Sequence, residues 1–335
     1  MRVNKMAMCL MKRGHELHLI TNKLVQYTDK FKTVIAYQSG EQLRDAVKLH
    51  PDADLFHAHN EPSWFVTVVK EVFPDKKVIL DVHDSMLLRR TEEEVEQNPG
   101  TFRWTADERN NMQLADGLVY VCKPMQDIVG PAYNITQPTA IIPNMVPKDF
   151  YRIDSIGIQR GLVYEGRIDL SKQLEKQWDF FEYSNYLPFA EECLKHGIPF
   201  HIYTARQNEE LRKAYNDKCI MHPPLSYDKL IKEIGVHDWG LVGNNTKHEE
   251  WKNALPNKLF EYMAACLPII CFNADESWNF IKDYDIGIKV DSFEEIKKRW
   301  NEAREKRNNL IKCRQQFTLD EQMPKLEALY KEVLA

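Results

Sequence analysis

Basic and acidic side chains gather at two places where an apolar run gives way to polar residues. Arg167 and Lys172 stand in an R-x(4)-K spacing directly after the apolar run of residues 161–166. If that run is a parallel strand, both cations lie at the carboxyl edge of its sheet, where ligands bind in α/β proteins. Arginine and lysine at such a point can stabilise negative charge that develops in a reaction. On the spacing alone, two solvated cations at the end of a strand remain the alternative.

The second place is the short stretch between Pro256 and Pro268. We expect Pro256 at the first position of a helix, with Asn257, Lys258 and Glu261 on one side of it. The free N–H groups and the positive end of such a helix attract anions. A surface carboxylate near a helix N-terminus is the alternative for Glu261. The opposite, buried side would consist of Leu259, Phe260, Met263 and Ala264.

Histidines mark the ends of two apolar runs in the first half of the chain. His57 and His59 end the run of residues 54–59, and His83 follows the run that starts at residue 77. Alternate residues of a strand point to one face, so His57 and His59 would share a face. A histidine at a strand end is often structural, which is the role we expect for His57, while His59 and His83 are candidate site residues.

Short apolar runs that alternate with amphipathic stretches position these residues. This alternation is typical of βαβ units and parallel sheets, so the fold class is α/β. The sequence predicts a first helix that ends near a glycine at 14, and a last helix with Thr318 as its N-cap. The predicted strands cover residues 16–21, 54–59, 77–84, 117–122, 139–144, 161–166, 199–204, 239–244 and 267–273.

Length and composition favour a soluble protein of two domains. A chain of 335 residues exceeds the usual size of a single core. Residues 143–160 contain two prolines and no clean period, so we expect a first domain over 1–152, a second over 153–317, and a C-terminal helix over 318–335 that packs back on the first domain.

Charge and cysteine content exclude several classes. The net charge of −5 argues against nucleic-acid binding. No apolar run is long enough to span a bilayer and the start does not resemble a signal peptide, so a cytoplasmic location is expected. The seven scattered cysteines form no zinc-type spacing and are expected to be free thiols.

The order of these motifs resembles the GT-B nucleotide-sugar glycosyltransferases, and among them the retaining group called family 4. Six phrases occur in the order and rough spacing typical of that family. They are "KRGHELHLIT", "DLFHAHN", "ILDVHD", "ERNNMQLADGLVYVC", "IIPNMVPKDF" and "YEGRIDLSK". The resemblance covers nearly the whole chain and implies two Rossmann-like domains that face a cleft. It also implies a strand and a glycine-bearing turn before the first helix, which this sequence lacks.

The resemblance implies a role for each candidate residue. Arg167 and Lys172 would grip the diphosphate of a nucleoside diphosphate sugar, with Asn257 and Lys258 beside them at the donor. Glu261 matches the family carboxylate that accepts hydrogen bonds from the ribose. His83 matches the histidine beside the transferred sugar. The implied activity is that of a metal-independent, hexosyltransferase-like enzyme without a cofactor.

The sequence departs from the family at Asn253. The family carries a glutamate there, separated by seven residues from a second glutamate, and asparagine brings no charge to a developing oxocarbenium ion. Glu249 and Glu250 lie one turn upstream and are possible substitutes. A catalytically weak or inactive relative that binds nucleotide or glycan as a partner subunit is therefore the alternative function.

Three further hypotheses concern substrates and metals. A sugar-nucleotide epimerase on the same fold is a third alternative. Loops at 222–227 and 85–104 are expected to contact the base and the acceptor, and Leu87 to Arg90 could meet a lipid-linked acceptor at a membrane surface. The triplets at 52–54 and 283–285 formally fit a metal-binding D-x-D pattern, but their contexts are a turn and a polar loop, and no metal is expected.

Overall fold

The computed structural model describes residues 2–22, 27–59, 64–89, 99–152, 161–170, 184–205, 208–247 and 249–335. These residues form two compact units. Unit 1 consists of Met1–Pro147 and Leu319–Ala335, and unit 2 of Lys148–Thr318. The expected boundaries, near 152 and 317, lie within a few residues of these two changes of unit.

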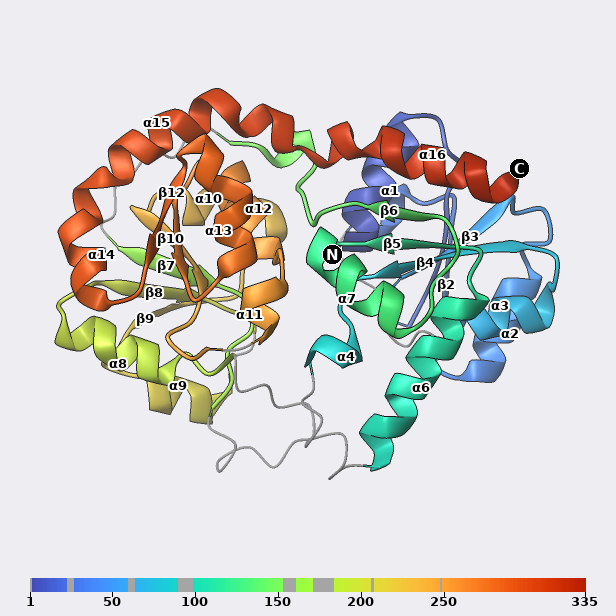
Figure 1. Ribbon diagram of the computed structural model, residues 1–335, viewed down its shortest axis with the longest axis horizontal. Coiled ribbons are helices and arrows are strands. Elements are labelled where there is room, and N and C mark those ends of the chain that lie inside the picture. Colours follow the sequence, from blue (N-terminus) through green and yellow to red (C-terminus); the bar gives the residue numbers. More distant parts are fainter. Residues whose placement is uncertain are drawn as a thin grey trace. The chain divides into compact units, whose positions relative to one another are not determined.

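Unit 1 contains two parallel sheets covered by helices (Figure 1). One sheet pairs β1 with β2, and the other has the order β3-β4-β5-β6. The helices are α1 (Arg2–Lys12), α2 (Gly40–Lys48), α3 (Phe65–Val72), α4 (Met86–Arg89), α6 (Pro99–Leu114), α7 (Lys123–Ala132) and α16 (Met323–Leu334). The strands are β1 (His18–Thr21), β2 (Thr33–Ala36), β3 (Leu55–His59), β4 (Lys77–Val82), β5 (Gly117–Tyr120) and β6 (Thr139–Ile141).

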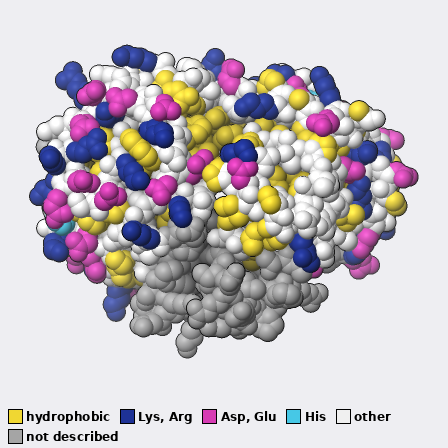
Figure 2. All heavy atoms as spheres, in the orientation of Figure 1, with side chains coloured by type: hydrophobic (Ala, Val, Ile, Leu, Met, Phe, Trp, Pro, Cys, Tyr) yellow, Lys and Arg dark blue, Asp and Glu magenta, His cyan; other side chains and the backbone are white. Residues whose placement is uncertain are grey.

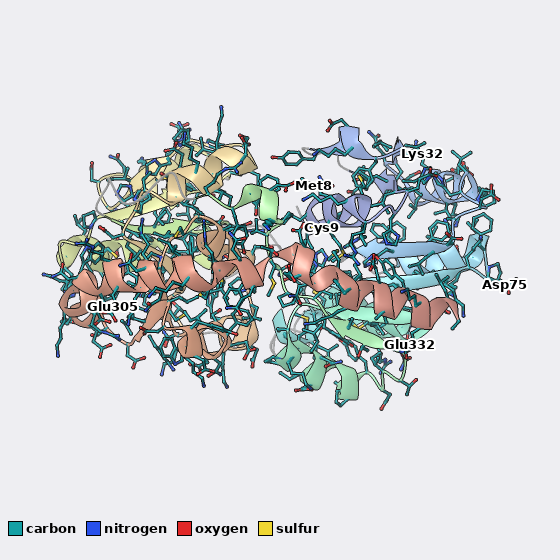
Figure 3. All side chains as sticks on the ribbon, turned by 90° about the horizontal axis from the view of Figure 1, so that it is seen from above. Met8, Cys9, Lys32, Asp75, Glu305 and Glu332 are labelled. Atoms are coloured by element: carbon teal, nitrogen blue, oxygen red, sulfur yellow. The ribbon has the colours of Figure 1, made fainter. Side chains whose placement is uncertain are left out.

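The first described element of unit 1 is the helix α1, as the sequence predicts. Its side chains are buried on nearly every side, among them Met8 and Cys9, which Figure 3 labels. The helix ends at Lys12, and Gly14 adopts the positive φ of 93° that only glycine takes easily. Within the described residues, β1 and β3 are each paired with a strand on one side only.

Unit 2 is built on one parallel sheet with the order β12-β11-β10-β7-β8-β9. Its strands are β7 (Leu162–Glu165), β8 (Phe200–Tyr203), β9 (Ile220–His222), β10 (Trp239–Gly243), β11 (Ile269–Phe272) and β12 (Gly287–Val290). Its helices are α8 (Leu187–Lys195), α9 (Glu209–Tyr215), α10 (Tyr227–Ile234), α11 (Glu249–Asn253), α12 (Asn257–Ala264), α13 (Asp275–Ile281), α14 (Phe293–Arg299) and α15 (Ala303–Cys313).

The α/β class and the parallel sheets are confirmed, and all nine predicted strands are present. Three strands were not predicted. β2 is mostly exposed, β9 has only three residues, and β12 carries a lysine in its middle, so none of them forms a clear apolar run.

The predicted start of the last helix is wrong. Thr318 does not cap α16, because a 3-10 turn (Leu319–Gln322) comes between them, and the Thr318 hydroxyl is buried without a hydrogen-bond partner. The α-helix starts at Met323, where Pro324 in its first turn suits a helix start. α16 packs against β5 and β6 of unit 1.

Positive and negative side chains are interspersed over the face shown in Figure 2, without a continuous field of one sign on the described residues there. The seven cysteines are free, and five of them are buried. No described helix is both long and apolar enough to cross a membrane.

Candidate functional site

In unit 2 the predicted cation Arg167 lies where β7 ends. Every residue of this strand is buried, and Gly166 then turns the chain with a φ of 135°. The Nε of Arg167 donates to both carboxylate oxygens of Asp169, at 3.1 and 2.9 Å. Asp169 is fully buried, whereas the Arg167 side chain is about one third exposed. The buried Asp169 carboxylate therefore orients the Arg167 guanidinium, a group with five N–H donors.

Lys258 reaches the same turn from another element. An ideal Cβ on Gly166 would lie 3.5 Å from the Cε of Lys258 and 3.1 Å from the hydroxyl of Tyr164. The ammonium of Lys258 lies 5.1 Å from the ring centroid of Tyr164 and 4.9 Å from that of Trp251, within cation–π range. The structure thus brings Arg167 and Lys258, two of the predicted donor-site cations, to one glycine turn.

The helix that carries Lys258 begins one residue later than predicted. Pro256 has an extended ψ of 156° and precedes the helix, so Asn257 takes the first helical position. Asn257 is exposed, and the residues from Leu259 to Ala264 are buried on all sides of α12. The buried side therefore includes Glu261, which the sequence places on the polar side.

Glu261 is a buried carboxylate, with 5% of its surface exposed. It lies among tyrosines: burial first, and then the nearby charge of Glu261, raise the pKa of the Tyr227 hydroxyl well above its usual value. Burial and the charge of Glu165, with a smaller contribution from Glu261, do the same for Tyr262. These tyrosines remain neutral at physiological pH and can act as hydrogen-bond donors.

A cavity of about 450 Å³ opens beside the end of β7. Its volume falls in the range of small-molecule sites. Its lining combines apolar side chains with the Glu165–Arg167 turn, and includes part of the 222–227 segment in which we expect base contacts. The lining residues are Glu165, Gly166, Arg167, Tyr203, Thr204, Ala205, Pro223, Pro224, Leu225 and Leu230.

Four further residues of unit 2 are predicted from the sequence for this site. Asn253 is the last residue of α11 and is partly buried. Glu249 and Glu250 begin that helix, but their side chains are not among the described ones. Lys172 lies outside the described residues.

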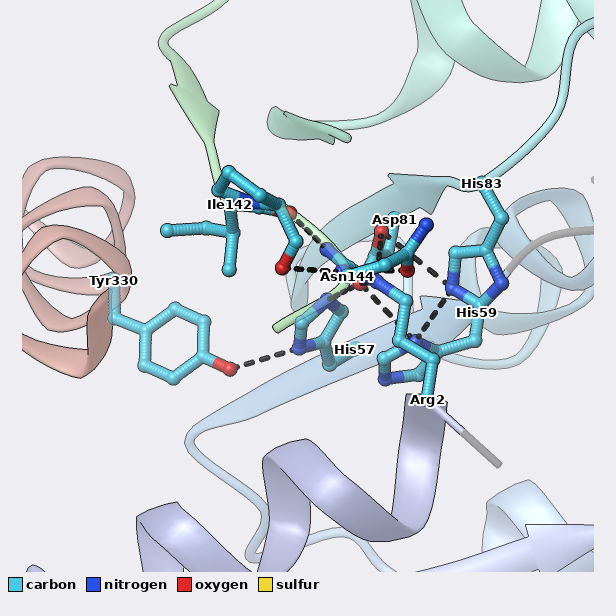
Figure 4. A network of polar contacts seen from close by, with 9 residues as sticks. Arg2, His57, His59, Asp81, His83, Ile142, Asn144 and Tyr330 are labelled. Carbon is cyan, nitrogen blue, oxygen red and sulfur yellow. Dashed lines mark hydrogen bonds and ion pairs between the residues drawn. The ribbon is translucent and has the colours of Figure 1, made fainter. Parts of the chain in front are cut away.

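In unit 1 the predicted histidines surround Asp81, a fully buried carboxylate at the end region of β4 (Figure 4). Nδ1 of His59 lies 3.3 Å and Nε2 of His83 3.5 Å from its oxygens. The two imidazoles contact each other at 3.3 Å. His59 and His83, predicted separately, therefore belong to one network.

Arg2 completes this network from the N-terminus of α1. Its Nε donates to Asp81 at 2.9 Å, and its terminal nitrogens donate to the Ile142 carbonyl at 2.7 Å and the Asn144 side chain at 3.0 Å. Arg2 is 5% exposed. A buried carboxylate needs a cationic partner, and Arg2 supplies it.

His57 is joined to another element. Its Nδ1 lies 2.7 Å from the hydroxyl of Tyr330 in α16 (Figure 4). Its Nε2 is buried without a hydrogen-bond partner. This arrangement suits the structural role expected for His57, because it links β3 to the C-terminal helix.

Burial and charge set the protonation of this network. Burial disfavours the ionised form of Asp81, but the Arg2 guanidinium and the two neighbouring imidazoles outweigh it and hold the pKa of Asp81 well below its usual range. Burial, and then repulsion from His59, lower the pKa of His57 far below its usual value. Burial also lowers the pKa of His59, against the opposing effect of Asp81. His57 and His59 are therefore neutral near pH 7.

Sequence reasoning missed Arg2 and Asp81 as site residues. The available signal was the aspartate inside the apolar run "KVILDV", since an ionised group in a buried strand requires a partner. Nothing in the sequence named Arg2 as that partner, because the two lie 79 positions apart.

The structure also describes parts of the second D-x-D triplet and of the loop that could meet a lipid-linked acceptor. In the second D-x-D triplet, Oδ1 of Asp285 lies 2.6 Å from Nζ of Lys306, so this carboxylate is part of an ion pair. Of the proposed membrane-facing residues, Leu87 is 36% exposed, whereas the Arg89 side chain and Arg90 lie outside the described part.

Comparison with known families assigns both halves of the chain. Residues 2–150 match the family described as Glycosyltransferase Family 4, and residues 183–318 match the Glucosyltransferase 3-like, C-terminal domain. A comparison with curated protein sequences finds no significant match.

Solved structures give the same fold at low identity. A sucrose-phosphate synthase from Thermosynechococcus elongatus is 13% identical with a TM-score of 0.69, over 97% of this chain and 92% of that one. A trehalose-6-phosphate synthase, described in work on glycosyltransfer with retention, is 12% identical with a TM-score of 0.57, over 89% and 80%. An E. coli structure described as trehalose-6-phosphate bound with UDP-2-fluoro glucose is 13% identical with a TM-score of 0.59, over 87% and 76%.

These matches define a two-domain glycosyltransferase architecture of the GT-B type. The chain belongs to the GT-B glycosyltransferases, with a family 4 first half and a Glucosyltransferase 3-like second half.

Proposed function

We propose that this glycosyltransferase moves a sugar from a nucleoside diphosphate sugar to an acceptor hydroxyl, with retention of the anomeric configuration and without a metal. The observation that carries the proposal is the convergence of Arg167 and Lys258 on the Gly166 turn, beside a cavity of about 450 Å³. The neighbour described with UDP-2-fluoro glucose supports this class of donor, and the one described for transfer with retention supports the stereochemistry.

Each residue has a task in this proposal. When the bond from the anomeric carbon to the diphosphate breaks, negative charge grows on the leaving group and positive charge on the sugar ring. Arg167 and Lys258 stabilise the diphosphate, with Lys172 and Asn257 as further donor-site residues, and they do so without a metal ion. Glu261 accepts hydrogen bonds from the ribose. His83, oriented by Asp81, lies beside the transferred sugar.

A thermal-shift panel with UDP, GDP, ADP, CMP and dTDP, each with and without Mg²⁺, tests the donor site. A nucleotide at one hundred times its dissociation constant stabilises the native state by about 2.7 kcal/mol. We expect one of the nucleoside diphosphates to raise the melting temperature of the protein without Mg²⁺. Arg167→Ala and Glu261→Ala should abolish that shift, and Arg304→Ala, at an exposed arginine of α15, should keep it. A shift that needs Mg²⁺, or that survives Arg167→Ala, would contradict the proposal.

The second candidate is a binding subunit of low or no catalytic activity, and Asn253 favours it. An amide stands where a carboxylate would stabilise the oxocarbenium ion. This candidate predicts the same nucleotide-induced thermal shift without release of nucleoside diphosphate from any sugar donor. Measuring the release of nucleoside diphosphate therefore separates the two functions.

A further inference from the structure

Three histidines meet on one face of the unit 2 sheet, outside the residues assigned to the transfer reaction. His201 lies in β8, His222 ends β9, and His237 lies two residues before β10. One ring nitrogen from each lies within 4.8 Å of the others. Nδ1 of His201 and Nε2 of His222 are 2.9 Å apart.

The strand order explains how His237 reaches the other two. β7 separates β10 from β8, so a side chain of β7 would normally stand between His237 and His201. Gly161, directly before β7, has no side chain there. An ideal Cβ on it would lie 2.7 Å from Nε2 of His201 and 3.4 Å from Nδ1 of His237. The glycine therefore leaves the space in which the histidines meet.

His237 carries an unused ligand atom. Its side chain is fully buried, and its Nδ1 has no hydrogen-bond partner. Its Nε2 lies 3.2 Å from the hydroxyl of Tyr203, which also stacks on His222 with ring centroids 4.0 Å apart. Histidines that ligate metals usually engage the second ring nitrogen in such a bond, which fixes the orientation of the ring. Burial, and then the neighbouring imidazoles and Arg307, lower the pKa of His237 to about 3, so its ring is neutral as a ligand must be.

We propose that His201, His222 and His237 bind a divalent transition-metal ion, of which Zn²⁺ is the natural probe. Three imidazole nitrogens suit zinc, and two nitrogens bound at about 2.0–2.1 Å to one tetrahedral ion lie about 3.3 Å apart. The ion ties β8, β9 and the start of β10 together behind Tyr203, which lines the cavity. It takes no part in sugar transfer, and the inference does not rest on the proposed function.

A second cluster with metal-type spacing, among the residues that the structure describes, does not support the same inference. In His57, His59 and Asp81 the carboxylate already holds the Arg2 guanidinium at 2.9 Å. A metal ion there would have to displace this buried cation.

The test uses the whole chain, stripped with a chelator, reloaded with Zn²⁺ and freed of excess metal before elemental analysis. We expect about one Zn²⁺ per wild-type chain. His222→Ala, at the least buried of the three ligands, should lose at least tenfold in zinc affinity. His196→Ala, a histidine of the same unit outside the cluster, should bind zinc like the wild type, and circular dichroism verifies that each variant is folded. Failure of the wild type to retain Zn²⁺, or equal retention by His222→Ala, would overturn the proposal.

Cobalt distinguishes the histidines from the seven cysteines. Co²⁺ at a site of imidazole nitrogens should give visible ligand-field bands without the intense near-ultraviolet thiolate charge-transfer band. These visible bands should be missing in His237→Ala. A thiolate band in the wild type would place the ion at cysteines and refute the proposed site.

Discussion

At the scale of single residues, the first unit depends on the charge of Asp81. This carboxylate is the common partner of Arg2, His59 and His83 in a buried network. Replacing Asp81 by a neutral residue would leave the charge of Arg2 buried and uncompensated.

Asp81→Asn should therefore lower the free energy of unfolding by about 3–5 kcal/mol. The matched control is Glu71→Gln, because Glu71 forms an exposed ion pair with Arg44 at 2.7 Å; loss of such a pair costs about 0–1 kcal/mol. Urea denaturation of both variants measures the difference. If both variants lost the same small amount of unfolding free energy, the buried charge of Arg2 would not need Asp81 as its partner.

The neutral histidines give the stability of unit 1 a dependence on pH. The pKa values of His57 and His59 are lowered in the folded protein, mainly by burial, so the unfolded chain binds more protons as the pH falls. Their contribution is complete above the unfolded pKa of about 6.5 and is lost as the pH falls below it.

We expect the free energy of unfolding to decrease below about pH 6.5 by up to about 1.4 kcal/mol per pH unit for each titrating imidazole. His57→Gln removes one of these groups and should flatten the decrease between pH 6.5 and 5. Denaturation curves over that range measure the slope. An unchanged slope in His57→Gln would mean that His57 is protonated in the folded state as easily as in the unfolded chain.

At the scale of elements, the proposed donor site at Arg167 and Lys258 depends on the turn between β7 and Arg167. Gly166 has a φ of 135°, which side chains rarely tolerate, and an added Cβ would press on Tyr164 and approach Lys258. The turn therefore controls where both cations lie.

Gly166→Ala should weaken nucleotide binding at least about tenfold, since strain of about 1–3 kcal/mol is expected at such a position. Gly197→Ala is the control. Gly197 also has a positive φ, of 66°, but a Cβ there would meet nothing within 4 Å. Titration calorimetry with the nucleotide found in the thermal-shift panel measures both. Equal affinities of the two variants would contradict the role given to the turn.

The elements also show what the sequence could predict. Apolar runs such as those of β4 and β7 determine strands locally, and for that reason all nine predicted strands are present. The sequence did not predict the three-residue strand β9 or the 3-10 turn that follows Thr318. Both depend on tertiary contacts rather than on a periodic pattern of apolar residues. The contacts of Arg2 with Asp81, and of His237 with His201 across Gly161, join distant segments and leave no mark in the local pattern.

At the scale of the whole molecule, the two family matches together cover most of the chain, and each unit carries its own set of candidate residues. Unit 2 supplies Arg167, Lys258 and Glu261, which we assign to the donor. Unit 1 supplies His83 and its Asp81 network, which we assign to the transferred sugar. The proposed function requires both sets to act in one reaction.

Proton NMR of donor turnover tests this central claim most directly. The protein is incubated with α-linked nucleotide sugars that carry the nucleotide found in the thermal-shift panel, and the sugar released to water is observed before its anomers interconvert. The account predicts release of nucleoside diphosphate with the α-anomer appearing first, lost in Arg167→Ala and kept in Arg304→Ala. A β-anomer appearing first would contradict retention, and nucleotide binding without any release would favour the binding subunit instead.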